Sequence, residues 1–383
     1  MTSSEALPTS ALRALVVDDD LTINRLLQLR LEGRGFRVQT VYSGEAALAQ
    51  VSAQRPDVIF LDVSLPGISG LEVLEQVRAK TQDMAVIMTT AFGSEQVATD
   101  ALRHGADDYL RKPFEPAEFE TVLDRTVSRL QLSRQNTALR QALDEKRRQL
   151  EMELARAGKV QTDLLPHSYP SLPRFQLAAR CLPAREVGGD FYDWQQVAPG
   201  VLSLTMGDVM GKGMPAALLM ATVRAALRTV AGRNSPALTL EMARRALTDD
   251  LDRSGSFVTI FHAQLEAAGG HLAYVDAGHG YVFIRRANGT VKELPLRGLP
   301  LGIPSPEPYQ EGVHTFCPGD ALVLYSDGLI EAQPTLGASN MQVARALAGA
   351  TSAEAMVERL IAQANPDGPP PDDLTVVILL CTR

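Results

Sequence analysis

The chain has 383 residues, more than one hydrophobic core usually spans, so two domains of ordinary size are expected. Hydrophobic residues make up 45% and charged residues 21%, as in ordinary globular proteins, and no apolar run approaches the ~20 residues that cross a bilayer. With 45 acidic against 37 basic residues the net charge is −8, so we expect a protein partner or a small ligand and neither nucleic acid nor membrane.

Cysteine usage and the first residues indicate the compartment. Cys181, Cys317 and Cys381 are odd in number and far apart, which favours a reducing environment over a disulfide framework. Residues 1–11 lack the pattern of a signal peptide and are expected to be a disordered N-terminus. We therefore expect a cytoplasmic protein. Cys181 and Cys317 have no neighbouring histidine or basic pair to lower the thiol pKa, so buried packing roles are expected for both.

Residues 12–130 alternate short apolar runs with amphipathic stretches, as repeated strand and helix units do. The expected strands are 12–17, 36–40, 58–61, 85–89 and 107–110. The expected helices are 23–31, 44–51, 70–79, 95–103 and one that starts at Pro116. This pattern predicts an α/β flavodoxin-like domain with a five-strand parallel sheet, in which ligands bind at the carboxyl ends of the strands.

Polar side chains follow four of these five strands. They are Asp18 and Asp19, then Asp62, Thr90 and Lys112. One aspartate in a loop is usually only solvated surface, but three carboxylates, a hydroxyl and an ammonium at one sheet edge point to a site.

This set resembles the receiver domain of two-component response regulators, and the likeness extends to Leu65-Pro66-Gly67, Thr90-Ala91 and Lys112-Pro113-Phe114. The resemblance implies that Asp62 accepts a phosphoryl group from a sensor histidine kinase and that Lys112 neutralises the acyl phosphate. It also implies a Mg²⁺ ion in the receiver, held by Asp18, Asp19, Asp62 and the backbone carbonyl of Ser64.

The same resemblance implies a switch. Thr90 would bind a phosphoryl oxygen and draw its loop inward, and Tyr109 would turn toward the space that is vacated. The Lys112–Pro113 peptide bond is expected to be cis.

The segment 131–165 has almost no helix-breaking residue, because proline is absent between Pro116 and Pro166 and Gly158 is its only glycine. A continuous helix of ~50 residues is expected. A heptad-like seam runs along it through Leu132, Asn136, Leu139, Leu143, Lys146, Leu150, then Leu154 or Glu153, Ala157, Val160 and Leu164. This favours a coiled-coil homodimer, weakened but kept in register by Asn136 and Lys146, over the alternative of a lone helix packed on its own domains.

After Pro173 the chain becomes rich in strands. The expected strands are 175–181, 201–209, 257–265, 272–277, 281–286, 290–294, 321–326 and 374–381, with a hairpin turn at Asn288-Gly289. Helices are expected over 215–230, 236–251 and 352–364, the last with a capping-box pattern at Thr351 and Glu354. Residues 166–383 are therefore expected to form an α+β domain, a two-sheet antiparallel sandwich flanked by helices.

Four acidic motifs lie at the ends of strand-like runs or beside glycines. They are Gly188-Gly189-Asp190 with Asp193, Gly207-Asp208-Val209, Ser326-Asp327-Gly328 and Asp372-Asp373-Leu374-Thr375. Carboxylates in one pocket repel one another unless a cation lies among them, so such a cluster is either a hard-metal site or a set of raised pKa values. Ligands that are all oxygen favour Mg²⁺ or Mn²⁺ over zinc.

In this order the motifs resemble the SpoIIE-type branch of the metal-dependent (PPM family) protein phosphatases, from about residue 160 to 381. The resemblance implies two Mn²⁺ or Mg²⁺ ions that activate water for in-line attack on a serine or threonine phosphate. It places Asp208 between the ions, Asp190 and the Val209 carbonyl on one, and Asp327 and Asp372 on the other. It implies supporting roles for Gly188, Gly189, Asp193 and Asp373.

Other residues near these motifs have competing interpretations. Lys212 and Arg185 could hold the substrate phosphate, but an ordinary surface charge is favoured for each. His279 is expected to be packed and hydrogen-bonded rather than a metal ligand. The proline-rich run 366–371 is interpreted as a stiff loop that delivers Asp372 to the site.

The sequence thus predicts a response regulator whose output is a metal-dependent serine/threonine phosphatase. By resemblance its substrate is a phosphorylated anti-sigma-factor antagonist. The competing hypothesis is a scaffold that binds a phosphoprotein without hydrolysing it, although the acidic character of every metal position argues against it.

Overall fold

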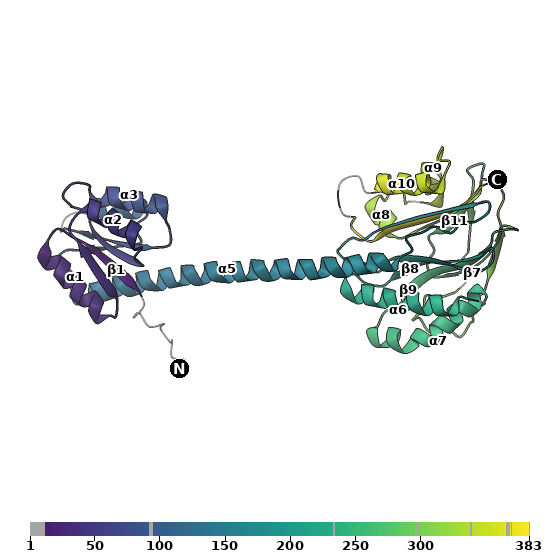
Figure 1. Cartoon of the computed structure of the whole chain (residues 1–383), viewed down its shortest axis with the longest axis horizontal. Coiled ribbons are helices and arrows are strands. Elements are labelled where there is room, and N and C mark those ends of the chain that lie inside the picture. Colours follow the sequence, from purple (N-terminus) through teal and green to yellow (C-terminus); the bar gives the residue numbers. More distant parts are fainter. Residues whose placement is uncertain are drawn as a thin grey trace. The chain divides into compact units, whose positions relative to one another are not determined.

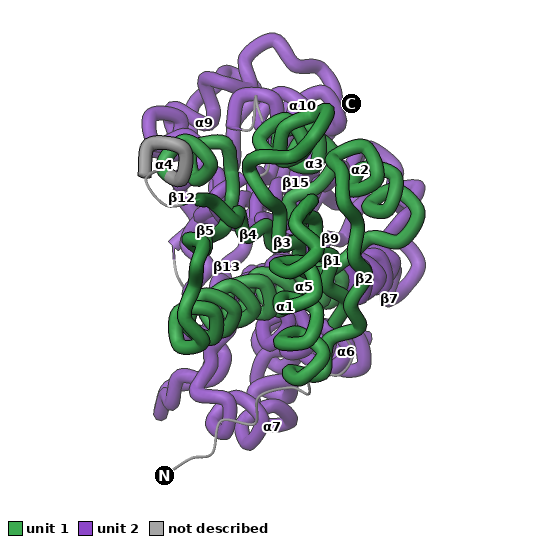
Figure 2. The backbone as a smooth tube through the Cα atoms, turned by 90° about the vertical axis from the view of Figure 1, so that its left-hand side faces the viewer, with its two compact units in different colours: residues 1–147 green, residues 148–383 purple. Residues whose placement is uncertain are grey.

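The computed structural model describes residues 12–91, 95–232, 234–295, 298–337, 339–364, 368 and 370–382 (Figure 1). The expected disordered N-terminus, 1–11, and half of the proline-rich run 366–371 lie outside the described residues. The chain forms two compact units, residues 1–147 and 148–383 (Figure 2). Among the described residues, no helix combines the length and the apolarity needed to span a bilayer.

The first unit is a five-stranded parallel sheet in the order β2-β1-β3-β4-β5. Its strands are β1 (Arg13–Val17), β2 (Arg37–Val41), β3 (Val58–Asp62), β4 (Ala85–Thr90) and β5 (Asp108–Arg111). Its helices are α1 (Leu21–Gly33), α2 (Gly44–Ala53), α3 (Gly70–Lys80), α4 (Glu95–Arg103) and the start of α5 (Pro116–Leu164). The predicted flavodoxin-like fold is confirmed.

Both faces of this sheet are buried. Phe60 of β3 packs with residues of α1 and α5, whereas its neighbours Ile59 and Leu61 pack with residues of α2 and α3. Successive side chains of a strand point to opposite faces, so a nearly continuous apolar run such as Val58–Asp62 fits a strand covered on both sides.

Helix α5 is continuous over 49 residues, as its lack of helix breakers predicts. Its contacts with the first unit extend to Arg134, whose guanidinium lies 2.8 Å from an Asp57 carboxylate oxygen. Beyond this point the seam leucines Leu139, Leu143 and Leu150 are 68%, 69% and 52% exposed. The middle of the helix is therefore not packed on its own domains.

The second unit contains two five-stranded antiparallel sheets. One has the order β13-β10-β9-β8-β7 and the other β12-β11-β14-β15-β6. The strands are β6 (Phe175–Leu182), β7 (Phe191–Ala198), β8 (Val201–Val209), β9 (Val258–Glu266), β10 (His271–Ala277), β11 (Val282–Arg285), β12 (Val291–Glu293), β13 (Gly312–Thr315), β14 (Ala321–Tyr325) and β15 (Leu374–Cys381). A buried apolar core that includes Leu204, Phe261 and Val377 fills the space between them. The predicted antiparallel sandwich is confirmed.

Helices cover both outer faces of the sandwich (Figure 1). On one side are α6 (Met214–Val230) and α7 (Pro236–Ser254); on the other are α8 (Gly328–Ala332), α9 (Asn340–Ala346) and α10 (Ala353–Ala364). The predicted turn at Asn288-Gly289 joins β11 to β12, with Gly289 at φ 83°. The cap of α10 differs from the expectation, because the Ser352 hydroxyl, rather than Thr351, accepts a hydrogen bond from the Ala355 amide.

Two candidate acidic sites

The first site lies at the carboxyl ends of β1 and β3. These strands are adjacent and parallel, so Asp18 and Asp19, which follow β1, lie beside Asp62 at the end of β3. The three residues can offer carboxylate oxygens that all lie within 4.8 Å of one another. Asp18 and Asp62 are buried whereas Asp19 is exposed, so one side of the cluster is open to solvent.

Lys112 joins these carboxylates from the end of β5. Its Nζ lies 2.6 Å from Asp18 Oδ2 and 2.8 Å from Asp62 Oδ2. Burial raises the pKa of Asp18, while the hydrogen bond from Lys112 opposes that rise. Although burial acts in the opposite direction, the hydrogen bonds to Asp18 and Asp62 raise the pKa of Lys112 and favour its ammonium form. The Lys112–Pro113 bond is cis, as predicted.

The remaining receiver residues lie around this centre. The Ser64 amide is 3.4 Å from Asp62 Oδ1, so its backbone is next to the carboxylate. Thr90 is buried, and its hydroxyl donates to the Ala91 carbonyl at 3.2 Å. Tyr109 is 41% exposed. The five positions predicted to form the receiver site therefore meet at one sheet edge.

The second site is a cavity of ≈ 350 Å³ in the second unit. Five aspartates line it: Asp190, Asp208, Asp327, Asp372 and Asp373. Strand pairing brings them together, because β7 pairs with β8 in a register that sets Phe191 opposite Gly207, and β14 pairs with β15 so that Tyr325 is opposite Val376. Asp190 is thereby held next to Asp208. Asp327, which follows β14, is held near Asp372, which precedes β15.

The negative charges of the carboxylates in this cavity repel one another, which favours the protonated form of each. Burial, then the charges of Asp327 and Asp372, raises the pKa of Asp208 to about 7. Burial, then the charge of Asp208, raises the pKa of Asp190 well above its ordinary value. Buried and half-buried carboxylates that repel one another are the donor set that a hard divalent cation satisfies, so these residues fit one or two Mg²⁺ or Mn²⁺ ions.

Asp373 organises the loop before β7 rather than only lining the cavity. Its carboxylate accepts hydrogen bonds from the amides of Ala184 at 2.8 Å and Gly189 at 2.6 Å. A Cβ atom at Gly188 would lie 2.2 Å from Asp373 Oδ2, and one at Gly328 would lie 2.1 Å from the Asp373 carbonyl oxygen. These glycines are thus needed because other chain segments pass where a side chain would be.

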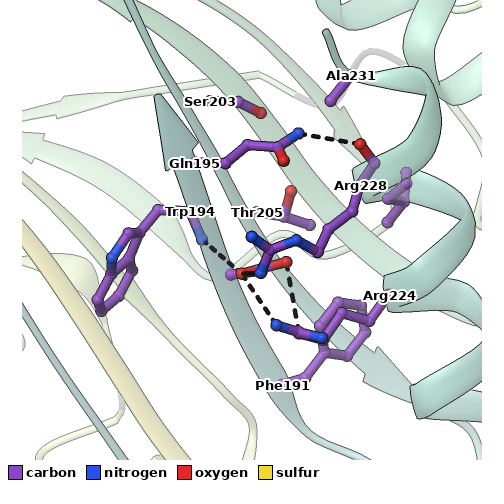
Figure 3. A pocket seen from close by; sticks show the side chains of 10 residues that line it. Phe191, Trp194, Gln195, Ser203, Thr205, Arg224, Arg228 and Ala231 are labelled. Atoms are coloured by element: carbon purple, nitrogen blue, oxygen red, sulfur yellow. Dashed lines mark hydrogen bonds and ion pairs between the residues drawn. The ribbon is translucent and has the colours of Figure 1, made fainter. Parts of the chain in front are cut away.

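Asp193 is placed differently from the expectation. It does not line the cavity; its carboxylate lies 3.0 Å from Arg228 Nη1 and 3.4 Å from Arg224 Nε, and Figure 3 shows these two arginines extending from α6. Side chains alternate along β7, and Asp193 shares with Phe191 the face that α6 covers. The contacts that the structure gives Asp193 thus join β7 to α6.

Lys212, in contrast, does reach the cavity. Its Nζ lies 2.7 Å from Asp372 Oδ2, although the residue is exposed, as Arg185 is. His279 is buried against the cavity, and burial lowers the pKa of its imidazole to about 4. Its backbone amide donates to Asp276 Oδ1 at 2.8 Å, but its imidazole Nε2 is buried without a hydrogen-bond partner among the described residues, so the expected packing is seen and a hydrogen bond at that nitrogen is not.

The prediction that Cys181 and Cys317 are both buried is wrong for Cys317 and only partly right for Cys181. Cys317 is exposed, because it lies in the turn before β14, whereas Cys181 is half-buried. Burial raises the pKa of the Cys181 thiol, so its thiolate is disfavoured.

One residue at this site was not singled out by the sequence. The Gln161 side chain at the end of α5 donates to the Gly188 carbonyl at 2.6 Å and accepts from the Gly188 amide at 3.1 Å. A Cβ atom at Gly158, one turn earlier, would lie 2.0 Å from the Glu186 carbonyl oxygen. The lone glycine in a long helix was the available signal, since such a glycine often marks close backbone approach.

Family models match both units. A response regulator receiver domain covers residues 14–124, and a Stage II sporulation protein E (SpoIIE) domain covers residues 198–381. The chain therefore contains a region that matches the receiver domain, followed by a region that matches the SpoIIE domain.

Individual relatives agree with this composition. The chain is 27% identical to Protein IcfG of Synechocystis over 209 residues, which are 48% of this chain and 33% of IcfG. It is 39% identical to the alkaline phosphatase synthesis transcriptional regulatory protein PhoP of Bacillus subtilis over 121 residues, 32% of this chain and 50% of PhoP. The chain thus spans a third to a half of the length of these curated relatives. Among solved structures, the SiaA-PP2C domain of Pseudomonas aeruginosa has a TM-score of 0.52 at 21% identity, covering 61% of this chain and 97% of that one, which indicates a shared fold.

Proposed function

We propose that this protein is a response regulator whose output is the metal-dependent hydrolysis of phosphoserine or phosphothreonine in a partner protein. The observation that carries the proposal is the convergence of five aspartates on one cavity, in a chain that also holds a complete receiver constellation. The proposed domains are the receiver at 12–130, the coiled-coil connector at 131–165 and the phosphatase at 166–383.

In the phosphatase, Asp190, Asp208, Asp327 and Asp372 and the Val209 carbonyl would hold two Mn²⁺ or Mg²⁺ ions. When bound, the ions would lower the pKa of a water molecule and screen the negative charge of the substrate phosphate. Asp373 and Gly189 fix the loop that carries Asp190, so the ligand geometry is set before the substrate binds. Buried His279, with its low pKa, adds no positive charge to the site at neutral pH.

In the receiver, Asp18, Asp19, Asp62 and the Ser64 carbonyl would hold Mg²⁺, and Asp62 would accept phosphate from a sensor histidine kinase. Lys112, already within hydrogen-bond distance of Asp62, would neutralise the charge that phosphorylation adds. Thr90 and Tyr109 would carry the switch. We expect a cytoplasmic homodimer joined through α5, and by resemblance an anti-sigma-factor antagonist as substrate.

Control of hydrolysis by the receiver is part of this proposal. Two features support it: α5 runs unbroken from Pro116 to Leu164, and its last turns contact the loop of Asp190 through Gln161 and Gly158. A displacement or rotation of α5 would therefore move the loop at Gly188 and change the position of Asp190, a proposed metal ligand two residues further on.

The proposal is tested at Asp208, the residue that would hold both ions. Asp208→Asn should lower metal-dependent hydrolysis of p-nitrophenyl phosphate by about 100-fold or more, since each metal-based electrostatic contribution is worth several kcal/mol. The exposed Asp249→Asn on α7 is the matched control and should keep the wild-type rate. A wild-type rate in Asp208→Asn would contradict the proposed metal site, whereas no turnover by the wild-type protein would favour the phosphoprotein-binding scaffold.

A further inference from the structure

Lys212 is the positively charged side chain among the described residues that line the acidic cavity. Its Nζ lies 2.7 Å from Asp372 Oδ2 and 3.4 Å from the Pro371 carbonyl oxygen. The Asp372 side chain is only 18% exposed, whereas that of Lys212 is 42% exposed. The ammonium therefore approaches a largely buried ligand carboxylate from the solvent side.

The loop that carries Lys212 has open space next to both of its neighbouring glycines. Gly211 and Gly213 flank it with φ values of 102° and 78°, and a Cβ atom at either would meet no atom within 4 Å. The loop is thus uncrowded on both sides of Lys212, and the lysine stem has four rotatable bonds. Loss of the Asp372 contact would not require the strands or α6 to move.

The ion pair between Lys212 and Asp372 reduces the repulsion among the carboxylates of the cavity. Five aspartates line the cavity, and a single ammonium offsets part of their repulsion. A divalent cation bound through Asp372 would use the same carboxylate and would be repelled by the ammonium. Lys212 and the cation are therefore alternative partners of Asp372.

We propose that Lys212 is an internal counter-cation of Asp372 that a divalent cation displaces, and that the released ammonium then binds an oxygen of the substrate phosphate. This inference rests on the proposed metal site. It links the two binding events, because cation binding frees the group that holds the anionic substrate at the mouth of the cavity.

The test measures binding, without catalysis. Mn²⁺ affinity is determined by calorimetry on the full chain with the receiver replacements Asp19→Asn and Asp62→Asn, which leave the phosphatase cavity as the titrated site. Lys212→Met, which keeps the length of the side chain, should bind Mn²⁺ about tenfold more tightly, since it removes both the competitor and its repulsion. Lys212→Arg should stay close to wild type.

Lys159→Met provides the charge-matched control, because Lys159 is exposed on α5 outside the cavity lining. Its Mn²⁺ affinity should be unchanged. Unchanged or weaker Mn²⁺ binding in Lys212→Met would overturn the inference, and so would an equal gain in Lys159→Met. Thermal unfolding checks that each variant folds, and Mn²⁺ should raise the melting temperature of Lys212→Met more than that of wild type.

The second half of the inference is tested with inorganic phosphate at saturating Mn²⁺. Lys212→Met should bind phosphate about tenfold more weakly than wild type, and equal affinity would overturn the proposed release toward the substrate. Asp372→Asn separates this inference from the metal site itself. If Asp372→Asn leaves Mn²⁺ affinity unchanged, the proposed metal site is wrong; if it weakens binding while Lys212→Met has no effect, only the role of Lys212 is wrong.

Discussion

Asp193 illustrates how an acidic residue in a metal-site motif can serve another purpose. Its side chain is 6% exposed and lies between the guanidinium groups of Arg224 and Arg228. Asp193→Asn would leave two cations facing each other without a counter-charge, so it should lower the free energy of unfolding by about 3 kcal/mol. Mn²⁺ affinity should stay within twofold. Urea unfolding and calorimetry measure the two, and weakened Mn²⁺ binding with unchanged stability would return Asp193 to the metal site.

A second prediction concerns His262, which is fully buried on β9 with its Nδ1 2.8 Å from the Thr205 hydroxyl. Burial lowers its pKa from 6.5 to about 4, so between these values the unfolded chain binds a proton that the folded chain does not. Stability is thus fully present above pH 6.5 and falls toward pH 4, by about 3 kcal/mol for this group.

His262→Gln should therefore show a shallower loss of unfolding free energy between pH 6.5 and 4. The exposed His271 offers the control, and His271→Gln should keep the wild-type slope. Parallel slopes for wild type and His262→Gln in urea titrations across this range would contradict the assignment.

At this scale the sequence predicted the residues whose position depends only on where a strand ends. Asp62 follows a buried strand, and the end of a parallel strand is a defined place in the sheet. Lys212 and Asp193 could not be assigned in this way, because their partners, Asp372 and Arg224, are 160 and 31 residues away and the direction of each side chain depends on the packing of α6 and its preceding loop.

Strand β7 is not among the strands predicted from the sequence, and the burial of its residues explains why. Its first four residues are all buried because Phe191 and Asp193 face α6 while Tyr192 and Trp194 face the second sheet. A strand covered on both faces loses its period of two, and the aspartate within it reads as a loop. Helix α5 was predicted well because a stretch with no proline after Pro116 and only one glycine, Gly158, is a local property that tertiary contacts do not override.

The contact between α5 and the Asp190 loop yields a prediction about one element. Gln161→Ala removes both hydrogen bonds to Gly188, so the loop should lose part of its fixed position and the hydrolysis rate should fall about tenfold. Gln149→Ala is the control on the same helix, with the same change of side chain at an exposed site. Equal rates in the two variants would mean that Asp373 alone holds the loop.

For the whole molecule, the prediction joins the receiver to the output. Incubation with acetyl phosphate and Mg²⁺ should add one base-labile phosphate per chain, and Asp62→Ala should add none. In the wild-type chain, beryllium fluoride, an acyl-phosphate mimic, should change both the hydrolysis rate and the molecular mass from light scattering. A rate that does not respond to the mimic would remove the proposed control while leaving the phosphatase assignment intact.

The exposed position of Cys317 offers a way to follow that change directly. Cys381 is buried and Cys181 is half-buried with a raised thiol pKa, so a maleimide fluorophore would react selectively at Cys317 in the native chain. The Cys317 amide donates to Asp320 Oδ2 at 3.0 Å, which anchors the backbone at the point of attachment. In a dimer labelled with donor and acceptor dyes, energy transfer between the two copies would report the separation of the phosphatase domains as the receivers are phosphorylated, without any engineered cysteine.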